Sequence, residues 1–269
     1  MGWPRQRRRE ASILLALTAV ALLVRVHELD ATSLWIDEAF SAWVTTHGVA
    51  EIWQVIPRFD THPPLYHALL DRWVSLFGDG EAALRSLSVA LAVATVPVIY
   101  LAGRALAPVP VDGPWLGALA AALFALAPFQ IAYAQEARSY AALVAAAAVA
   151  LLGALRLLRE PAALAGVPWL GLGSGGTGPA RAAWALLVTG WALCLWLHNL
   201  GTLVLAAFLP PLGWWWFERG RDRTVVANLA LAVALAILLW LPNAPAALGQ
   251  AGDVAKGFPD QPSNSSSLG

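Results

Sequence analysis

Two neighbouring carboxylates, Asp37 and Glu38, follow the first apolar run of the chain, in the stretch LWIDE at residues 34–38. Ionisable side chains at membrane depth are costly to place and often mark a function. We therefore take the two acids as candidate catalytic residues at a membrane surface. The alternative is that they only open a surface helix, because acidic side chains suit the positive end of a helix dipole.

Further polar groups accompany these acids at intervals along the chain. They are the candidate substrate-binding residues His62, Tyr66, Arg85, Glu136 and Arg138. Each also has a purely structural interpretation. Arg85 can anchor a span at the membrane interface, and Glu136 can form a structural ion pair with Arg138. His198 also lies near this set, and we interpret it as a structural histidine in a tight turn.

The composition predicts a membrane protein. Hydrophobic residues make up 59% of the 269 positions, charged residues 13%, and the mean hydropathy is +0.62. A soluble domain is about 25% charged, so this chain has too little charge to cover a surface that faces water. The net charge is +0, and no basic stripe predicts a nucleic-acid partner. The single cysteine, Cys194, excludes an intramolecular disulfide and a cysteine-based metal site.

Apolar runs long enough to cross a bilayer predict an all-α, polytopic protein with about seven transmembrane helices. Tryptophans at the ends of several runs fit an interfacial belt, and a sugar-stacking surface is the alternative. A Gly-rich stretch at 168–178 is expected to be a loop, because it lacks the spacing of a phosphate-binding loop. The expected spans are 11–29, 84–106, 115–134, 140–158, 182–197, 202–217 and 224–241.

Three regions are expected: a basic cytoplasmic segment (1–10), a transmembrane module (11–248) and a polar, disordered tail (249–269). The first apolar run can also be a cleaved signal peptide, because a basic segment precedes it. We prefer an uncleaved span with Arg25 reaching the interface at its outer end. Residues 30–84 form an outer loop whose short amphipathic segments, 39–46, 49–56 and 65–77, predict helices lying on the membrane.

The basic residues predict an orientation. With the N-terminus inside, eleven fall in inner segments and five in outer segments, with Arg25 ambiguous, and an excess inside is the rule for cytoplasmic loops. The outer set is Arg58, Arg72, Arg85, Arg138 and Lys256; the inner set is Arg5, Arg7, Arg8, Arg9, Arg104, Arg156, Arg159, Arg181, Arg219, Arg221 and Arg223. All the candidate site residues then lie on the outer face of the cytoplasmic membrane.

A transferase on that face needs a donor that arrives within the membrane, since nucleotide sugars and ATP are supplied in the cytoplasm. A polyprenyl-phosphate sugar meets this need, and its phosphate is already a good leaving group. The site then requires one carboxylate to take a proton from the acceptor hydroxyl and cations to hold the phosphate charge. A glycosidase would also need a second, protonating carboxyl group.

Four motifs resemble those of glycosyltransferase family 39, which belongs to the GT-C superfamily of membrane enzymes. They are LWIDEA (34–39), THPPLY (61–66), LFGDGEAALR (76–85) and YAQEARSY (133–140). The family contains relatives of the dolichyl-phosphate-mannose protein mannosyltransferases and of the lipid A aminoarabinose transferases. The resemblance extends to about residue 242. Family members usually continue with more spans, so we expect the chain to correspond to their N-terminal part.

The resemblance implies roles for individual residues. Asp37 is the catalytic carboxylate, as base or acceptor ligand, and Glu38 supports it. His62 and Tyr66 fall in the motif near the donor phosphate, with His62 where relatives often carry His or Lys. Glu136 takes the place of a second acid, often Asp in relatives.

The resemblance also implies that Arg85 and Arg138 face phosphate or pair with the acids. The expected partners are a polyprenyl-phosphate sugar, an extracytoplasmic protein, lipid or glycan acceptor, and membrane lipid. No cofactor is required, although the oxygens of Asp37, Glu38 and Glu136 can hold a divalent cation. Two other functions remain: a non-catalytic or truncated scaffold of the same fold, and a transporter. A transporter would need charges at mid-span depth and paired repeats, and the sequence has neither.

Overall fold

The structure, a computed structural model, describes residues 3–60, 62–109, 112–160, 164, 178–218, 220–247 and 249. Of these residues 84% are helical and none lies in a strand, which confirms the all-α prediction. The expected Gly-rich loop (168–178) and the expected tail (249–269) fall almost wholly outside the described residues.

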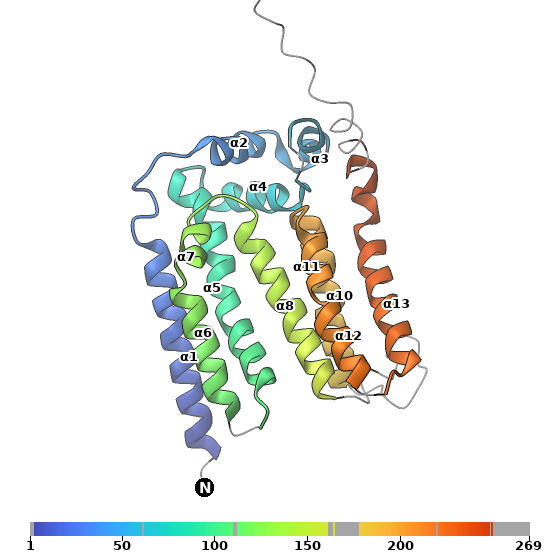
Figure 1. Ribbon diagram of the computed structural model, residues 1–269. Helices are drawn as coiled ribbons and strands as arrows, with labels where there is room; N and C mark the ends of the chain where they lie inside the picture. Colours follow the sequence, from blue (N-terminus) through green and yellow to red (C-terminus); the bar gives the residue numbers. More distant parts are fainter. Residues whose placement is uncertain are drawn as a thin grey trace, which may run out of the picture.

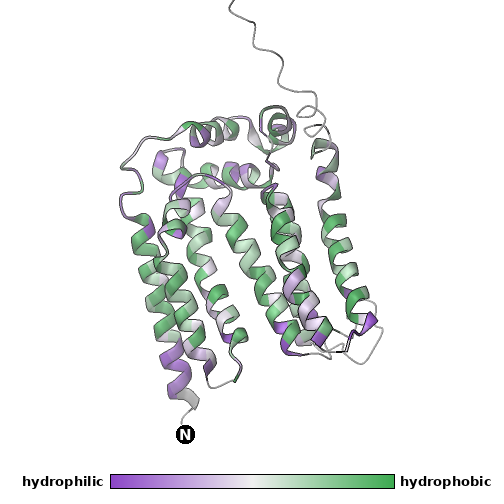
Figure 2. Ribbon diagram, viewed as in Figure 1, coloured by the Kyte–Doolittle hydropathy of each residue, from purple (hydrophilic) through white to green (hydrophobic). Residues whose placement is uncertain are grey.

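Long helices run side by side, and the chain begins at one end of the bundle they form (Figure 1). Hydrophobic residues cover the middle of these helices, and hydrophilic residues gather toward the ends (Figure 2). The bundle comprises α1 (Trp3–Val26), α5 (Glu81–Leu106), α6 (Gly113–Leu126), α7 (Pro128–Ala134), α8 (Tyr140–Arg159), α10 (Gly178–Leu197), α11 (Gly201–Ala207), α12 (Leu209–Glu218), α13 (Arg223–Trp240) and the 3₁₀ turn η2 (Leu241–Asn243).

Four helices in the described part of the chain are long and apolar enough to cross a membrane: α5, α8, α10 and the one that begins with α13. A fifth span is possible if α6 and α7 cross together. They are bent by 58° at Ala127, just before Pro128, because a proline cannot continue the hydrogen-bond ladder of the preceding helix. These helices support a membrane protein with four or five candidate spans, where the sequence predicts about seven.

The two remaining predicted spans differ from the others for local reasons. In α1, Arg9 and Glu10 border the apolar run on one side and Arg25 on the other. The predicted span at 202–217 is divided at Phe208 into α11, of 7 residues, and α12, of 10 residues. Neither piece alone reaches the roughly 20 residues that a span requires.

Arg25 does not reach the interface, so that expectation is wrong. Its side chain is fully buried, and its two terminal nitrogens donate to the carbonyl oxygens of Phe124 (3.2 Å) and Ala125 (2.9 Å) at the end of α6. The last carbonyls of a helix lack partners within the helix and attract cations. The break between α6 and α7 exposes these carbonyls, and Arg25 stabilises it.

Small residues bring the two central helices, α8 and α10, into close contact. A Cβ added at Gly153 would lie 2.5 Å from the backbone nitrogen of Leu187, and one at Gly190 would lie 2.5 Å from that of Ala150. Close approach at small residues is the usual way in which helices pack within membranes. The contact fixes α8, which follows Arg138, against α10, which precedes His198.

Three short helices cross one end of the bundle: α2 (Ile36–Thr45), α3 (Gly48–Phe59) and α4 (Leu65–Phe77) (Figure 1). They correspond to the three amphipathic segments predicted in the outer loop. Val44 of α2 packs with Ile52 and Ile56 of α3 in a small apolar cluster. The apolar stripes predicted from the sequence thus join these helices to one another as well as to the bundle.

Candidate functional site

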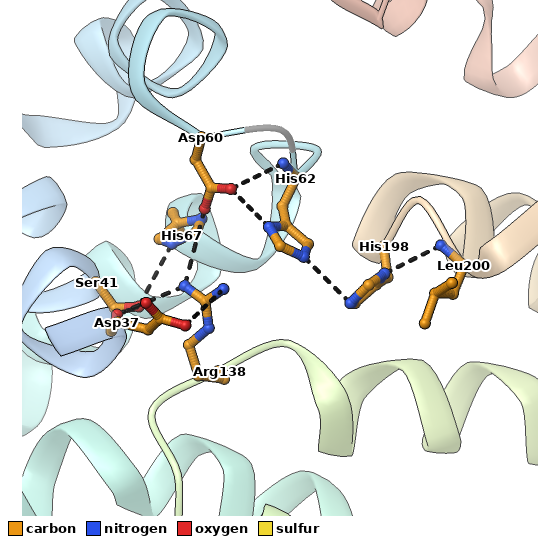
Figure 3. A network of polar contacts seen from close by, with 8 residues as sticks. All are labelled: Asp37, Ser41, Asp60, His62, His67, Arg138, His198 and Leu200. Carbon is orange, nitrogen blue, oxygen red and sulfur yellow. Dashed lines mark hydrogen bonds and ion pairs between the residues drawn. The ribbon is translucent and has the colours of Figure 1, made fainter. Parts of the chain in front are cut away.

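The predicted site residues meet at the end of the bundle that α2, α3 and α4 cross. Asp37 and Glu38 lie in the first turn of α2, and Arg85 lies near the start of α5. Arg138 lies in the link between α7 and α8. Three segments that are far apart in the sequence therefore contribute to one polar cluster, part of which is drawn in Figure 3.

Glu38 and Arg85 form a buried ion pair, with side chains that are 1% and 4% exposed. Arg85 Nη2 donates to Glu38 Oε2 at 2.7 Å, and Arg85 Nε donates to Glu38 Oε1 at 2.9 Å. The remaining capacity of the carboxylate is also used, because it accepts from the backbone N–H groups of Ala137 (2.8 Å) and Trp35 (3.4 Å). Glu38 thereby joins α2, α5 and the link between α7 and α8.

The guanidinium of Arg85 is equally occupied. It donates to the carbonyl oxygens of Leu29 (2.8 Å), Thr32 (2.9 Å) and Ser33 (3.3 Å), in the segment that connects α1 to α2. Burial alone raises the pKa of Glu38, but the hydrogen bonds from Arg85 and from the backbone outweigh it and hold that pKa below its usual range. The pair is ionised and complete, so it positions the site and has no capacity left for a substrate.

Asp37, the preceding residue, has the opposite environment. Its side chain is 43% exposed, and its Oδ2 lies 3.8 Å from Nη2 of Arg138. That separation is too long for a hydrogen bond. Asp37 is therefore an accessible carboxylate beside a cation, which is the arrangement needed to accept a proton or to bind a hydroxyl.

Arg138 lies between two carboxylates (Figure 3). Its Nη1 is 3.8 Å from Oδ2 of Asp60 and 3.5 Å from the carbonyl oxygen of Asp37, while the side chain is 7% exposed. Among the described residues, its five N–H donors make only that one long hydrogen bond. A guanidinium can bind a phosphate with two parallel hydrogen bonds, and Arg138 has the donors to do so.

Asp60, which follows α3, holds His62 in place. Its Oδ1 accepts from the backbone N–H of His62 at 3.1 Å and from the ring Nδ1 at 2.6 Å. Burial raises the pKa of Asp60, but the contacts with His62 outweigh it and lower the pKa to about 2. Because an ionised carboxylate only accepts hydrogen bonds, Nδ1 of His62 carries a proton.

His62 contacts His198, which lies in the turn between α10 and α11. The Nε2 atoms of the two rings are 3.2 Å apart, and Nδ1 of His198 accepts from the backbone N–H of Leu200 at 3.0 Å. Nδ1 of His198 therefore holds a lone pair, so its proton is on Nε2. That proton is donated to Nε2 of His62. The backbone N–H group of Leu200 thus fixes the tautomer of His198. Together with the carboxylate of Asp60, it fixes the ring protons of His62 and His198.

The triad in this arrangement requires both rings to be neutral. If His62 took up a second proton, two N–H groups would face each other across 3.2 Å, and the ring of His198 would have to turn away. Burial lowers the pKa of His198 to about 4. With His198 neutral, its Nε2–H group occupies the lone pair on Nε2 of His62.

Tyr66 lies beneath the site and supports Arg138 through its backbone. Its side chain is 1% exposed, its hydroxyl is 3.0 Å from Ser88 Oγ, and Ser88 Oγ donates to the carbonyl oxygen of Arg138 at 3.2 Å. Burial raises the pKa of Tyr66, so the phenol is protonated and donates to Ser88. The buried position of Tyr66 favours a supporting role over the predicted substrate-binding one.

Glu136 is half-buried beside the cluster. Within the described part of the chain it makes no hydrogen bond or ion pair, so the structural pair with Arg138, the alternative interpretation from the sequence, is not formed. Burial raises the pKa of Glu136, and the nearby Glu38 raises it further.

Metal binding is not favoured by the described residues. None of their His, Cys, Asp and Glu side chains form a group of three or more that could hold a metal ion. The facing Nε2 atoms of His62 and His198 are the nearest approach to a metal-ligand pair. A metal there would force the proton of His198 onto Nδ1, where it would face the N–H group of Leu200.

Two residues of the cluster, Asp60 and His198, are absent from the set of site residues predicted from the sequence. Asp60 stands two residues before His62, a spacing that allows a carboxylate to contact the backbone and ring of the same histidine. His198 ends a predicted span on the same side as the other candidates. Our prediction of a structural histidine missed its contact with His62, because that contact joins residues 136 positions apart.

Comparison of the chain with protein-family models, with curated proteins and with solved structures finds no match.

Proposed function

We propose that this protein is a membrane glycosyltransferase that moves a sugar from a polyprenyl-monophosphate donor to an acceptor hydroxyl, with inversion at the sugar carbon. One observation carries the proposal. An accessible carboxylate, Asp37, lies 3.8 Å from an arginine, Arg138, whose donors are almost unused. A base and an anion site side by side at the end of an apolar bundle suit a donor that is both phosphorylated and lipid-linked.

In the proposed reaction, Asp37 takes the proton of the acceptor hydroxyl as its oxygen attacks the anomeric carbon of the sugar. The bond between that carbon and the phosphate oxygen breaks, and its electron pair leaves with the polyprenyl phosphate. Arg138 neutralises the charge that develops on the phosphate. Inversion requires the hydroxyl to attack the sugar carbon from the face opposite the phosphate.

His62 is the second cation that we assign to the phosphate. In its protonated form both ring nitrogens donate hydrogen bonds, so Nε2 can bind a phosphate oxygen once His198 has turned away. Asp60 keeps its contact with Nδ1 throughout and stabilises the cation. Glu38, Arg85 and Tyr66 are positioning residues in this mechanism, because their bonding capacity is directed to the protein itself.

The proposal extends to the fold and its location. We place the chain in the cytoplasmic membrane as a GT-C-like protein of about seven spans, with a cytoplasmic N-terminus and the site on the outer face. The four or five candidate spans and the resemblance of residues 34–39 and 61–66 to family motifs support this placement. The acceptor is then an extracytoplasmic protein, lipid or glycan.

The test is donor consumption by membranes that contain the chain. Labelled polyprenyl-phosphate mannose, glucose and aminoarabinose are offered to membranes with the wild-type chain, Asp37→Asn or Glu51→Gln. Glu51 is an exposed acid on α3 and serves as the matched control. We expect wild type and Glu51→Gln to consume one donor and Asp37→Asn to consume none. Consumption by none of the three would favour a non-catalytic scaffold, and equal consumption by all would exclude Asp37 as the base.

A further inference from the structure

A cavity of about 460 Å³ opens between α1 and the start of α6, near the N-terminus and at the opposite end of the bundle from Asp37. Arg5, Arg9 and Trp115 are among the residues that line it. Arg5 and Arg9 are four residues apart on α1, so their side chains project from the same face of the helix. Two guanidinium groups from one face of α1 therefore line the cavity.

These two arginines have no partner within the described part of the chain. Glu10, the acid that also lines the cavity, is already engaged at both oxygens: Oε1 accepts from Gln6 at 3.3 Å and Oε2 from Arg104 at 2.6 Å. Its charge is balanced by Arg104, and the charges of Arg5 and Arg9 remain. Two unmatched cations in a concave site predict an anionic ligand.

The start of α6 forms part of the cavity wall. Pro114 and Trp115, in its first turn, line the cavity, and the preceding Asp112 makes no side-chain capping bond. The first N–H groups of a helix lack partners within the helix and favour anions. In α6, however, Pro114 has no N–H group and Asp112 carries a negative charge, so Arg5 and Arg9 are the source of the positive charge at the cavity.

An apolar stripe leads away from the cavity along α6. Trp115, Leu119, Leu123 and Leu126 are 68%, 59%, 64% and 56% exposed, and their spacing places them on one face. A soluble anion would gain nothing from this stripe, whereas an acyl chain would bury it. Trp115 stands where the stripe meets the cavity, which is the usual depth of tryptophan at a membrane interface.

We infer that this cavity binds an anionic phospholipid, with its headgroup phosphate between Arg5 and Arg9 and an acyl chain along the stripe from Trp115 to Leu126. The site is independent of the proposed transferase reaction, because it lies at the other end of the bundle and shares no residue with it. It fixes α1 against α6 in the leaflet on the N-terminal side. Basic pockets between helices at this depth are known to suit anionic headgroups.

The test is lipid binding to the purified full chain in detergent, followed by native mass spectrometry. Phosphatidylglycerol and phosphatidylcholine with identical acyl chains are compared. Each arginine near an anionic headgroup is worth about fivefold in affinity, so we expect the wild type to prefer phosphatidylglycerol by about tenfold or more. The variant Arg5→Gln/Arg9→Gln is expected to lose this preference. Arg8→Gln is the matched control and should keep it, because Arg8 does not line the cavity.

Two further arms identify the source of the phosphate. Inorganic phosphate at millimolar concentration should not displace phosphatidylglycerol, and Leu119→Ser/Leu123→Ser should weaken binding while keeping the headgroup preference. Displacement by inorganic phosphate would overturn the proposal in favour of a soluble anion. Equal binding of both lipids to the wild type would also overturn it, as would an equal loss in Arg8→Gln, since either would mean an annulus of bulk lipid or a general charge effect. Thermal unfolding midpoints confirm that each variant is folded.

Discussion

Asp37 and Glu38 are neighbours in the sequence and each faces an arginine, yet the two pairs have opposite environments. Glu38 and Arg85 are buried and joined by two hydrogen bonds of 2.7 and 2.9 Å. Asp37 and Arg138 are separated by 3.8 Å, and Asp37 is 43% exposed. Consecutive residues of a helix point about 100° apart, so one turn of α2 presents one acid to the protein and the other to the site.

The difference distinguishes an ion pair whose donors and acceptors are all used within the protein from one that keeps unused donors for a ligand. A buried pair that satisfies every donor and acceptor stabilises one arrangement of its helices, because breaking it leaves an uncompensated buried charge. A loose pair at the surface contributes little to stability, and its unused donors remain free for a ligand. We propose that the complete pair positions the site and that the loose pair takes part in the reaction.

The largest expected effect is on activity. Asp37→Asn should lower sugar transfer by about 10²- to 10⁴-fold, the range for loss of a general base. Its unfolding midpoint should stay close to that of the wild type, because the exposed carboxylate of Asp37 lies 3.8 Å from Arg138 and makes no side-chain hydrogen bond to it. A large loss of stability in this variant would contradict the comparison, since Asp37 would then resemble Glu38.

The largest effect on stability should come from breaking the complete pair. Glu38→Gln or Arg85→Met should each lower the free energy of unfolding by about 3–5 kcal/mol, because the remaining charge is buried without its partner. Thermal unfolding in detergent measures this loss. The double variant Glu38→Leu/Arg85→Met should recover part of it, whereas additive losses would mean that the pair is not the source.

The variant Arg138→Lys tests whether the loose pair of Asp37 and Arg138 binds the donor phosphate. A lysine keeps the charge but cannot place two parallel donors on a phosphate, so we expect kcat/KM for the donor to fall by about 10- to 100-fold. The exposed Arg72→Lys on α4 is the control and should leave kcat/KM unchanged. An unchanged kcat/KM for Arg138→Lys would mean that Arg138 does not bind the donor phosphate through two parallel hydrogen bonds.

Acidification should destabilise the protein through its buried histidines. Burial lowers the pKa of both His67 and His198 to about 4 from the usual 6.5. Because the unfolded chain takes up these protons at higher pH than the folded one, the stability present above about pH 6.5 is lost as the pH falls toward 4. The slope is up to about 1.4 kcal/mol per pH unit for each histidine.

Unfolding midpoints measured between pH 7 and 4 check this expectation. His198→Asn should reduce the pH dependence, and His27→Asn, in an exposed segment, should not. An unchanged slope in His198→Asn would mean that the ring is protonated in the folded protein, and the proton positions assigned to the triad would then be wrong.

The smallest expected effect is that of Tyr66→Phe. Loss of the hydroxyl removes one buried hydrogen bond to Ser88, which is worth about 1 kcal/mol. Activity should fall only a few-fold, because Arg138 remains in place with a weaker support. A complete loss of activity would instead mean that the hydroxyl of Tyr66 contacts the substrate.

The helices of the outer loop were well predicted. The amphipathic stripes at 39–46, 49–56 and 65–77 correspond to α2, α3 and α4, since a helix with one apolar face can be recognised without knowing what covers it. The transmembrane spans were predicted less well, because the length of an apolar run does not show whether the helix within it is continuous. It could not anticipate that Pro128 would bend one span by 58° or that another would divide at Phe208.

The sequence by itself determined the class of the molecule and identified the polar residues that are candidates for a functional site. Its low charge and long apolar runs require helices that bury their backbone groups, and its rare polar motifs gather near the ends of those helices. The tertiary structure alone decided what each polar residue does. The burial of Glu38, the exposure of Asp37 and the contact between His62 and His198 depend on partners 47 to 136 residues away. Hydrogen bonds and desolvation act between groups that are close in space, and the sequence does not state which groups those are.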